Sequence, residues 1–421
     1  MTVPWPIADP EVANAAQFLP RIAVVCDLVE ERWPSMDLVG EMLLSHLRRD
    51  YSEQFAVSKI CPPMRRRFSG QRAVGSGPQA ENGSQKSEGR DRRAEISRRF
   101  NADRFLNRFW DYPRFARGLK SEFDLFHLVD HSYAQLLHEL PPGRTIVTCH
   151  DLDTFQCLLN PAAEPRSVFF RKMVSRTLSG FRQAERVTCD SVATRDELLA
   201  HKLVEPERAV VIPNGVHPSC TPASDAIADQ EATRLLGEAS EDSFDILHVG
   251  STIPRKRIDL LLRIFAATRR EFPSARLLRV GGSFTSDQLK LAGELGIADA
   301  IVVLPRLERN LLAAVYRRAA VVLQPSEREG FGLPVVEAMA CGTAVVASDL
   351  PVLREVGGDA ALYCKVGDVA SWSKTVSQLL TERTRNTPSW SDRRVAGIAQ
   401  ASKFSWAEYT RKMVEVYREV L

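Results

Sequence analysis

The sequence lacks the features that would place it among membrane-spanning, secreted or zinc-binding proteins. No apolar run approaches about 18 residues, the length at which a membrane span becomes a candidate. The amino terminus has no basic start followed by an apolar core, so we expect no signal peptide. The eight cysteines are scattered singly without a C-x-x-C pair, which argues against zinc and for buried, reduced thiols. These absences together predict a cytoplasmic protein.

The overall composition is ordinary, but the charge is unevenly spread. The chain has 421 residues, of which 44% are apolar and 26% are charged. This length accommodates two α/β domains with complete cores. The formal net charge is +3, yet the segment Arg65–Arg108 alone holds 12 Lys and Arg against 5 Asp and Glu. The basic excess therefore belongs to one segment.

The most informative stretch covers residues 324–349 and reads QPSEREGFGLPVVEAMACGTAVVASD. Apolar runs at 320–324 and 344–347 predict two strands, and the turn and short helix between them complete half of a βαβ unit. The turn 329–332 then lies at the carboxyl end of a strand and the amino end of a helix. Its two glycines allow close approach of a ligand, and a helix N-terminus binds anions. A diphosphate would fit here.

Two glutamates belong to this turn and helix. Glu329 stands in the turn, and Glu337 follows about two helical turns later, close to the same face. Carboxylates so near a diphosphate would repel it. They are better suited to accept hydrogen bonds from neutral hydroxyl groups of a sugar or ribose. The plain alternative is that both side chains are merely solvated.

A second anion site is predicted where the strand Asp245–Val249 ends. Gly250 follows this strand, and Arg255 and Lys256 precede a predicted helix. Exposed Arg-Lys pairs are common, so this signal is weak by itself. In a parallel sheet the segment faces the Glu329 turn, and the two together predict a diphosphate clamp.

Polar clusters follow two apolar strands in the first half of the chain. Asp130 and His131 come after the strand 123–128, and His150 comes after the strand 145–149. The carboxyl ends of strands in an open α/β sheet line a ligand-binding crevice. We therefore expect a site here, with histidines satisfied in loops as the alternative. The other expected strands are 21–26, 54–60, 186–189, 209–212, 277–280, 301–304 and 361–364, and the expected helices are 38–47, 169–179, 191–201, 258–270, 369–380 and 404–421.

The spacing from Glu329 to Glu337 resembles the E-x(7)-E signature of retaining glycosyltransferases with the GT-B fold, and the surrounding string is similar to their family 4. The resemblance implies an α/β protein in which two Rossmann-like domains face each other across a cleft. It implies an acceptor domain over residues 1–213, a nucleotide-sugar donor domain over 214–403, and a final helix over 404–421 that returns to the first domain.

The resemblance also implies roles for individual residues. Arg255 and Lys256 would stabilise the negative charge on the leaving diphosphate. Glu329 would fix sugar hydroxyls, Glu337 would hold the ribose, and His150 would face the donor sugar. The remaining expected substrate-binding residues are Gly250, Leu304, Gly330, Phe331, Gly332 and Leu333 for the donor, and Asp130 and His131 for the acceptor.

The chain departs from the family's pattern at two places. Relatives carry an arginine where Ser251 stands, and paired glycines where residues 30–36 read EERWPSM. Asp151 and Asp153 also spell a metal-binding string of another glycosyltransferase fold. The glycine-rich turn argues instead for the metal-independent GT-B class, with no cofactor besides the donor.

Residues 64–110 form a basic insertion. Arginines interleave with aromatic residues over 90–110, whereas 70–89 is rich in Gly, Ser and Gln, as in a mobile surface loop. The pattern fits a peripheral contact with anionic lipid at the inner face of the plasma membrane, a site for a lipid-diphosphate-linked acceptor, or a solvated helix. No RNA- or DNA-binding motif accompanies the charge, so we expect no nucleic-acid partner.

The function that the resemblance implies is transfer of a hexose from a GDP- or UDP-linked donor to a saccharide or lipid-linked acceptor in surface or exopolysaccharide synthesis. Mannose is the sugar that we expect. One alternative is a nucleotide-sugar epimerase or phosphorylase of the same architecture. Another is a catalytically silent, sugar-nucleotide-binding scaffold subunit, which the departures at Ser251 and residues 30–36 leave open. The presence of Glu329, Glu337, Lys256 and His150 argues against it. Donor hydrolysis without acceptor would separate an enzyme from a scaffold.

Overall fold

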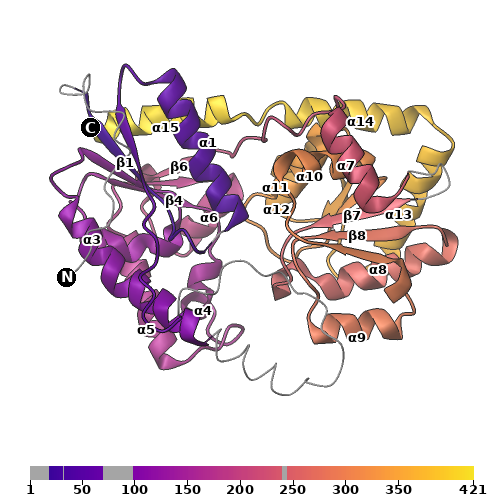
Figure 1. Ribbon diagram of the computed structural model, residues 1–421, viewed down its shortest axis with the longest axis horizontal. Helices are drawn as coiled ribbons and strands as arrows, with labels where there is room; N and C mark the ends of the chain where they lie inside the picture. Colours follow the sequence, from indigo (N-terminus) through magenta and orange to yellow (C-terminus); the bar gives the residue numbers. More distant parts are fainter. Residues whose placement is uncertain (1–18, 32, 70–97, 239–243) are drawn as a thin grey trace. The chain divides into compact units, whose positions relative to one another are not determined.

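The computed structural model describes residues 19–31, 33–69, 98–238 and 244–421. The chain forms two compact units, each with its own six-stranded parallel sheet (Figure 1). The α/β class predicted from the sequence is therefore confirmed. The first unit contains residues 1–189, 197–210 and 410–421, and the second contains 190–196 and 211–409. Within the described ranges, no helix has the length and apolar character needed to cross a bilayer.

The first sheet has the spatial order β2-β1-β3-β4-β5-β6. Strands β3 and β4 are buried along their whole length, which explains why their sequences are apolar runs rather than alternating patterns. Val25 of β1 pairs with Ile60 of β2 on one side and with Leu128 of β3 on the other. The strands are β1 (Arg21–Val25), β2 (Ala56–Ile60), β3 (Leu125–Leu128), β4 (Thr145–Cys149), β5 (Arg186–Cys189) and β6 (Ala209–Val211).

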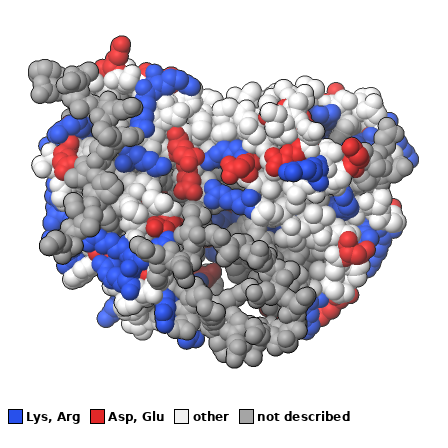
Figure 2. Space-filling model, viewed as in Figure 1, with Lys and Arg blue, Asp and Glu red and all other residues white. Residues whose placement is uncertain are grey.

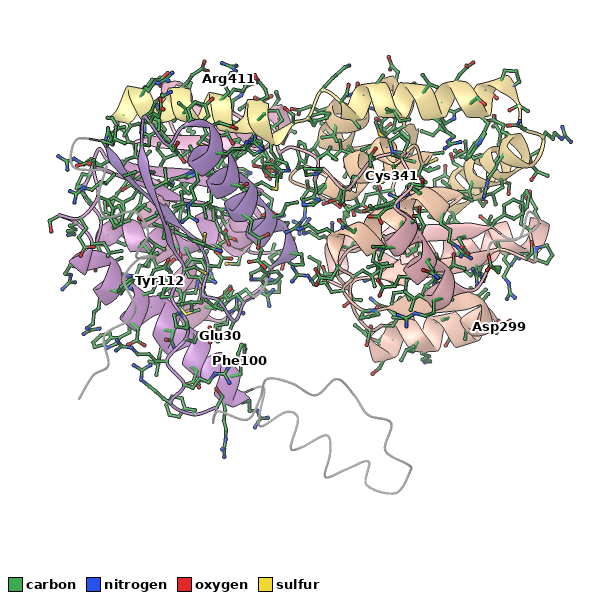
Figure 3. The ribbon with its side chains drawn as sticks, turned by 45° about the horizontal axis from the view of Figure 1, so that its top comes forward. Glu30, Phe100, Tyr112, Asp299, Cys341 and Arg411 are labelled. Carbon is green, nitrogen blue, oxygen red and sulfur yellow. The ribbon has the colours of Figure 1, made fainter. Side chains whose placement is uncertain are left out.

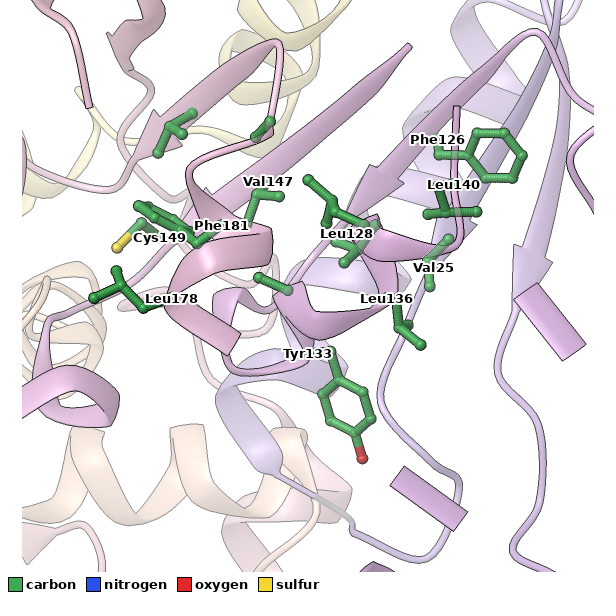
Figure 4. Close-up of a cluster of buried hydrophobic side chains, with 14 of the residues drawn as sticks. Val25, Phe126, Leu128, Tyr133, Leu136, Leu140, Val147, Cys149, Leu178 and Phe181 are labelled. Atoms are coloured by element: carbon green, nitrogen blue, oxygen red, sulfur yellow. The ribbon is translucent and has the colours of Figure 1, made fainter. Parts of the chain in front are cut away.

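The core of the first unit lies between the sheet and the helices that follow β3 and β4. Figure 4 shows this cluster, in which Leu128 and Val147 from the sheet meet Leu136 and Phe181 from the helical layer. The helical elements are α1 (Pro34–Asp50), the π-helical turn η2 (Asn107–Asp111), α3 (Tyr112–Gly118), the 3-10 helix η3 (His131–His138), α4 (Gln156–Leu159), α5 (Val168–Phe181) and α6 (Val192–Ala200).

The last helix, α15 (Trp406–Val420), contributes most of its length, from Thr410 onward, to the first unit. The Tyr417 hydroxyl lies 2.7 Å from His127 Nδ1, and His127 Nε2 lies 2.8 Å from Thr148 Oγ1. Burial, followed by the charge of His150, lowers the pKa of His127 to about 3. The ring is therefore neutral and serves as a structural link between α15 and the sheet.

The second sheet has the spatial order β12-β11-β10-β7-β8-β9. Val249 of β7 pairs with Val280 of β8, and Gln324 of β10 pairs with Ala347 of β11. The central position of β7 and β10 places the loops that follow them next to each other. The strands are β7 (Asp245–Val249), β8 (Arg276–Val280), β9 (Ile301–Leu304), β10 (Val321–Gln324), β11 (Val345–Ser348) and β12 (Leu362–Cys364).

Helices cover both faces of the second sheet. One apolar cluster joins the sheet to α10 and α11, and a separate cluster joins the opposite face to α8 and α13. This two-sided burial is typical of a parallel sheet. The helices are α7 (Ala226–Leu236), α8 (Ile258–Glu271), α9 (Ser286–Glu294), α10 (Arg309–Arg318), α11 (Leu333–Ala340), α12 (Pro351–Gly357), α13 (Val369–Thr384) and α14 (Pro388–Ala401).

Candidate active site

The loops after β7 and β10 meet at the carboxyl edge of the second sheet. The Glu327 backbone N–H donates to the Arg255 carbonyl oxygen at 2.8 Å. Lys256 Nζ lies 2.7 and 2.9 Å from the two carboxylate oxygens of Glu329, and Arg255 Nη1 donates to the Arg328 carbonyl at 3.0 Å. Three of the four residues predicted to be catalytic therefore form one cluster, because their strands are neighbours in the sheet.

Glu329 is ionised in this cluster. Its side chain is only 6% exposed, so burial by itself would raise the pKa of the carboxyl. The positive charges of Lys256 and Arg255 outweigh burial and hold the pKa of Glu329 below its ordinary value. Arg255 and Lys256, the cations of the predicted diphosphate clamp, thus have a carboxylate partner within the second unit.

Backbone geometry shapes the turn that leads into α11. Gly332 caps this helix with φ +96°, and a Cβ there would lie 2.6 Å from Leu353 Cδ2. The Gly330 carbonyl accepts hydrogen bonds from Ser191 Oγ at 2.9 Å and Thr194 Oγ1 at 3.2 Å. The expected binding residues Phe331 and Leu333 continue this turn, with Phe331 buried and Leu333 at the first helical position.

Glu337 has a different environment, on the face of α11 toward α10. Its Oε2 accepts a hydrogen bond from the Tyr316 hydroxyl at 2.9 Å. Burial raises the pKa of Glu337 to about 7, against the opposing effects of this hydrogen bond and of the Arg309 charge. Cys341, labelled in Figure 3, ends the same helix, and its hydrogen bond to Cys220, together with burial, raises the pKa of the Cys220 thiol.

Gly250 and Leu304, which were also expected to bind the donor, lie at the same carboxyl edge of the second sheet. Gly250 follows β7 with φ +155°, and its backbone N–H donates to the Val280 carbonyl at 3.0 Å. Leu304 ends β9 and pairs in register with Val280. Gly250, Leu304 and the Glu329 turn therefore share one sheet edge, and it is the edge at which open α/β sheets bind ligands.

Asp130, His131 and His150 gather at the carboxyl ends of β3 and β4 in the first unit. Asp130 caps η3 by accepting from Ser132 N at 2.7 Å and Ser132 Oγ at 2.6 Å. His150 Nε2 lies 2.6 Å from the Val129 carbonyl, and the His131 and His150 rings are 6.3 Å apart. The buried backbone partner of His150 is what the alternative interpretation, a satisfied loop histidine, expected. Its donor-facing role remains a prediction.

Asp27 belongs to this cluster and was missed by sequence reasoning. It follows β1, as Asp130 follows β3, and both side chains are buried. Burial, and then the charge of Asp130, raises the pKa of Asp27 well above its ordinary value. Burial opposes ionisation of Asp130 as well, but the charges of His131 and His150 lower its pKa. The pKa values of the two carboxyl groups are therefore shifted in opposite directions, that of Asp27 upward and that of Asp130 downward.

The basic insertion is partly tied into the first unit. Arg67 forms a two-pronged ion pair with Asp111 at 2.7 and 2.8 Å, and Arg104 pairs with Glu31 at 2.9 Å. Tyr112, the first residue of α3 (Figure 3), donates its hydroxyl to the Cys26 carbonyl at 2.8 Å. These arginines therefore have structural partners, which the charge count did not predict. The predicted loop 70–89 lies outside the described residues.

No group of three or more His, Cys, Asp or Glu residues in the described ranges is arranged to hold a metal ion. Asp151, from the metal-like string discounted above, accepts a hydrogen bond from the Asp153 backbone N–H at 3.0 Å. The string thus forms a local turn.

Two family models match the chain. Residues 73–219 match Glycosyltransferase Family 4, and residues 229–394 match Glycosyl transferases group 1. The chain thus carries two domains that are similar to glycosyltransferase domains of these two kinds. The group 1 domain contains the Arg255, Lys256 and Glu329 cluster, and the family 4 domain contains the cluster of Asp130, His131 and His150.

Curated relatives agree with this assignment over about half of the chain. The D-inositol 3-phosphate glycosyltransferase of Mycolicibacterium smegmatis is 33% identical over 54% of this chain and 53% of its own. The protein of the same name from Frankia alni is 33% identical over 56% of this chain and 59% of its own. The chain therefore spans about half the length of the curated relatives that it matches.

Solved structures match the glycosyltransferase domains over nearly the whole chain. Sucrose-phosphate synthase from Thermosynechococcus elongatus has a TM-score of 0.66 at 18% identity, covering 95% of this chain and 99% of that one. Anabaena HepE in complex with UDP and glucose has a TM-score of 0.66 at 16% identity, covering 95% and 100%. These likenesses confirm the GT-B fold predicted from the sequence.

Proposed function

We propose that this protein transfers a sugar from a nucleoside diphosphate sugar to a hydroxylated acceptor. The observation that carries the proposal is the cluster of Arg255 and Lys256 with Glu329 beside the amino end of α11. Two cations, one carboxylate and a glycine-rich helix start are the groups needed to hold a diphosphate next to sugar hydroxyls. The two glycosyltransferase domains support this reading.

Donor binding would exchange the partners within this cluster. In the structure, Glu329 neutralises Lys256. A diphosphate would take over Lys256 and Arg255, and Glu329 would then accept hydrogen bonds from the sugar. The cations would stabilise charge on the leaving diphosphate, which is electrostatic rather than proton catalysis. Retention of configuration, with a donor phosphate oxygen accepting the acceptor proton, follows from the family resemblance.

Glu337 is suited to a ribose. With its pKa near 7, the carboxyl is present in both protonation states at neutral pH, so it can accept from one hydroxyl or donate to another. The Tyr316 hydroxyl holds it in place.

UDP and GDP are the donor nucleotides that we propose, and UDP is tried first because HepE was solved with it. The curated relatives are named for an inositol phosphate acceptor. We propose a polyol, saccharide or lipid-linked acceptor, whose hydroxyls would meet the hydrogen-bonding groups of Asp27, Asp130 and His131. Mannose remains a donor sugar to be tested, as does a role in polysaccharide synthesis.

The decisive experiment is calorimetric titration of UDP, GDP and ADP into wild type, Lys256→Ala and Lys290→Ala. Lys290 is the matched control, because it is an exposed lysine of the same domain whose partner is Glu294 at 3.7 Å. One nucleotide should bind wild type and Lys290→Ala equally, and Lys256→Ala at least about tenfold more weakly. Binding of none by wild type would contradict the proposal. Donor hydrolysis by wild type would then separate an enzyme from a silent scaffold.

A membrane surface is a second partner that we propose for the first unit. Trp110 is 57% exposed and Phe169, on α5, is 62% exposed. The Arg114 guanidinium lies 3.3 Å from the centre of the Trp110 ring, and exposed Arg171 and Lys172 follow Phe169. Figure 2 shows Lys and Arg side chains gathered where α3 and α5 lie. Exposed aromatic and basic residues together fit an anionic lipid surface.

A further inference from the structure

Arg279, at the carboxyl end of β8, is a buried cation that forms no ion pair with any residue the structure describes. Its side chain has no exposed surface, and Nη1 donates to the Val280 carbonyl. Nε and Nη2 have no hydrogen-bond partner within the described part of the chain. Arg276, on the same strand, is different, because it lies 2.7 Å from the Asp245 carboxylate. An unpaired buried charge is costly, so Arg279 calls for an explanation that Arg276 does not.

The strand register places Arg279 beside a second buried basic side chain. His248 of β7 is its partner in the β7–β8 ladder. The imidazole is also fully buried, and neither ring nitrogen has a hydrogen-bond partner among the residues that the structure describes. Burial, followed by the charges of Arg279 and Lys256, lowers the pKa of His248 well below its ordinary value. The ring is therefore neutral, and it contributes no compensating charge.

Arg279 lies directly behind the proposed diphosphate clamp. A Cβ on Gly281 would lie 2.2 Å from the Gly250 carbonyl oxygen and 3.3 Å from Arg279 Nη1. A Cβ on Gly250 would lie 3.4 Å from His248 Cε1 and 3.7 Å from Lys256 Cε. Arg279, His248 and Lys256 thus surround the same pair of glycines at the sheet edge.

The charge of Arg279 persists at neutral pH. Burial lowers the pKa of the guanidinium only to about 10. A charge in a low-dielectric interior acts over a longer range than one in water, and salt screens it less. Lys256 and Arg255 share the carboxylate of Glu329, whereas Arg279 has no ion pair with any described residue, so Arg279 adds positive potential to this edge.

We propose that Arg279 is a positioning residue of the donor site, whose buried positive charge is compensated when a nucleoside diphosphate binds at the clamp. This inference rests on the proposed function. It assigns the diphosphate part of the donor a third cation that acts through Lys256 and the close approach of Gly250 and Gly281, rather than by contact. The protein gives up stability in the ligand-free state, and ligand binding recovers it.

The test compares Arg279→Met with Arg276→Met in the full chain. Methionine keeps much of the apolar stem of arginine and removes the charge. For each variant, the melting temperature without ligand and the affinities for UDP or GDP and for the uncharged nucleoside are measured at low and high salt. Arg279→Met should melt no lower than wild type and bind the nucleoside diphosphate about tenfold more weakly. Its nucleoside affinity should be unchanged, and the loss should persist at high salt.

Two control variants separate the charge of Arg279 from its neighbours and from its shape. Arg276→Met removes a paired cation, so it should lower the melting temperature and leave diphosphate affinity as in wild type. Arg279→Lys keeps the charge and should restore most of the affinity.

The outcomes separate this inference from the proposed function. If wild type binds no nucleoside diphosphate, both are overturned. If wild type binds and Arg279→Met binds equally well, only the inference is overturned. A lower melting temperature or failure of Arg279→Met to fold would also overturn it, because the guanidinium would then be a structural group.

Discussion

Lys256 Nζ lies 2.7 Å from one carboxylate oxygen of Glu329 and 2.9 Å from the other. This ion pair joins the loop after β7 to the loop after β10, and it supplies Lys256 with a carboxylate partner from the protein itself. Under the proposed function, a diphosphate would compete with this carboxylate for the same cation.

Replacing Glu329 by Gln tests this competition. The variant keeps the shape of the side chain and removes its charge, so UDP or GDP should bind as tightly as to wild type or more tightly. Turnover should fall by about 100-fold or more, because a group that orients the sugar is weakened. Calorimetry and steady-state rates measure the two effects. Glu327→Gln, an exposed position in the same loop, is the control, and a Glu329→Gln variant that loses nucleotide affinity would contradict the exchange of partners.

The arrangement of this site was predictable from the sequence because local patterns determine it. Apolar runs identified β7 and β10, and the residues after them, Gly250 and Glu329, therefore had to lie at the carboxyl edge. The helix expected over 191–201 forms as α6, and at its start Ser191 Oγ accepts from the Thr194 backbone N–H at 3.1 Å. Predictions of this kind need only the strand periodicity and the direction of a parallel sheet.

Features that depend on distant partners could not be predicted in the same way. The charge count treated Arg67 and Arg104 as free positive charges. In the structure Arg67 pairs with Asp111, 44 residues away, and Arg104 pairs with Glu31, 73 residues away. In the sequence, Arg279 looks like an ordinary strand residue. Its pairing with the buried His248 becomes visible only when the register of β7 and β8 is known. Helix α14 was not predicted from the sequence. Its position depends on a distant partner, because Gly397 lies against Met339 of α11.

The pH dependence of stability should report on Glu337. Its pKa is about 7 in the folded chain and about 4.3 when unfolded. Between these values the folded chain binds more protons than the unfolded chain. The free energy of unfolding should therefore decrease as pH rises through this window, by up to about 4 kcal/mol.

Chemical unfolding at pH 5 and pH 8 measures this effect. Glu337→Gln should lose most of the difference, because it cannot ionise. Glu294→Gln, which changes an exposed carboxylate, should behave as wild type does. Equal pH dependence in wild type and Glu337→Gln would refute the assignment.

The attachment of α15 to the first sheet should depend on one hydroxyl. Tyr417→Phe removes the partner of His127 Nδ1 and leaves this buried ring nitrogen without its hydrogen bond. The free energy of unfolding should fall by about 1–3 kcal/mol. Denaturant titration measures the loss, and Tyr51→Phe, at a half-buried position outside this network, serves as the control. No difference between the two variants would mean that the His127 link does not stabilise the helix.

Membrane association should depend on the exposed aromatic residues of the first unit. Vesicles that contain phosphatidylglycerol should sediment with wild type, and zwitterionic vesicles should not. The double variant Trp110→Ser, Phe169→Ser should lose this binding. Ile227→Ser is the matched control, since Ile227 is 81% exposed on α7 of the second unit. If the double variant still sediments with anionic vesicles, another surface binds them.

The start of α11 should tolerate no side chain at Gly332. Its φ of +96° disfavours any residue with a Cβ, and that atom would lie 2.6 Å from Leu353. Gly332→Ala should therefore lower the free energy of unfolding by at least about 1–2 kcal/mol. It should also weaken nucleotide binding, because the helix N-terminus would shift away from Lys256. Gly293→Ala, at a helical position with open space around it, should instead be neutral or stabilising by up to about 1 kcal/mol. If Gly332→Ala retains both stability and affinity, the backbone of this turn does not hold the phosphate groups. Binding of the anion would then depend on Arg255 and Lys256 alone.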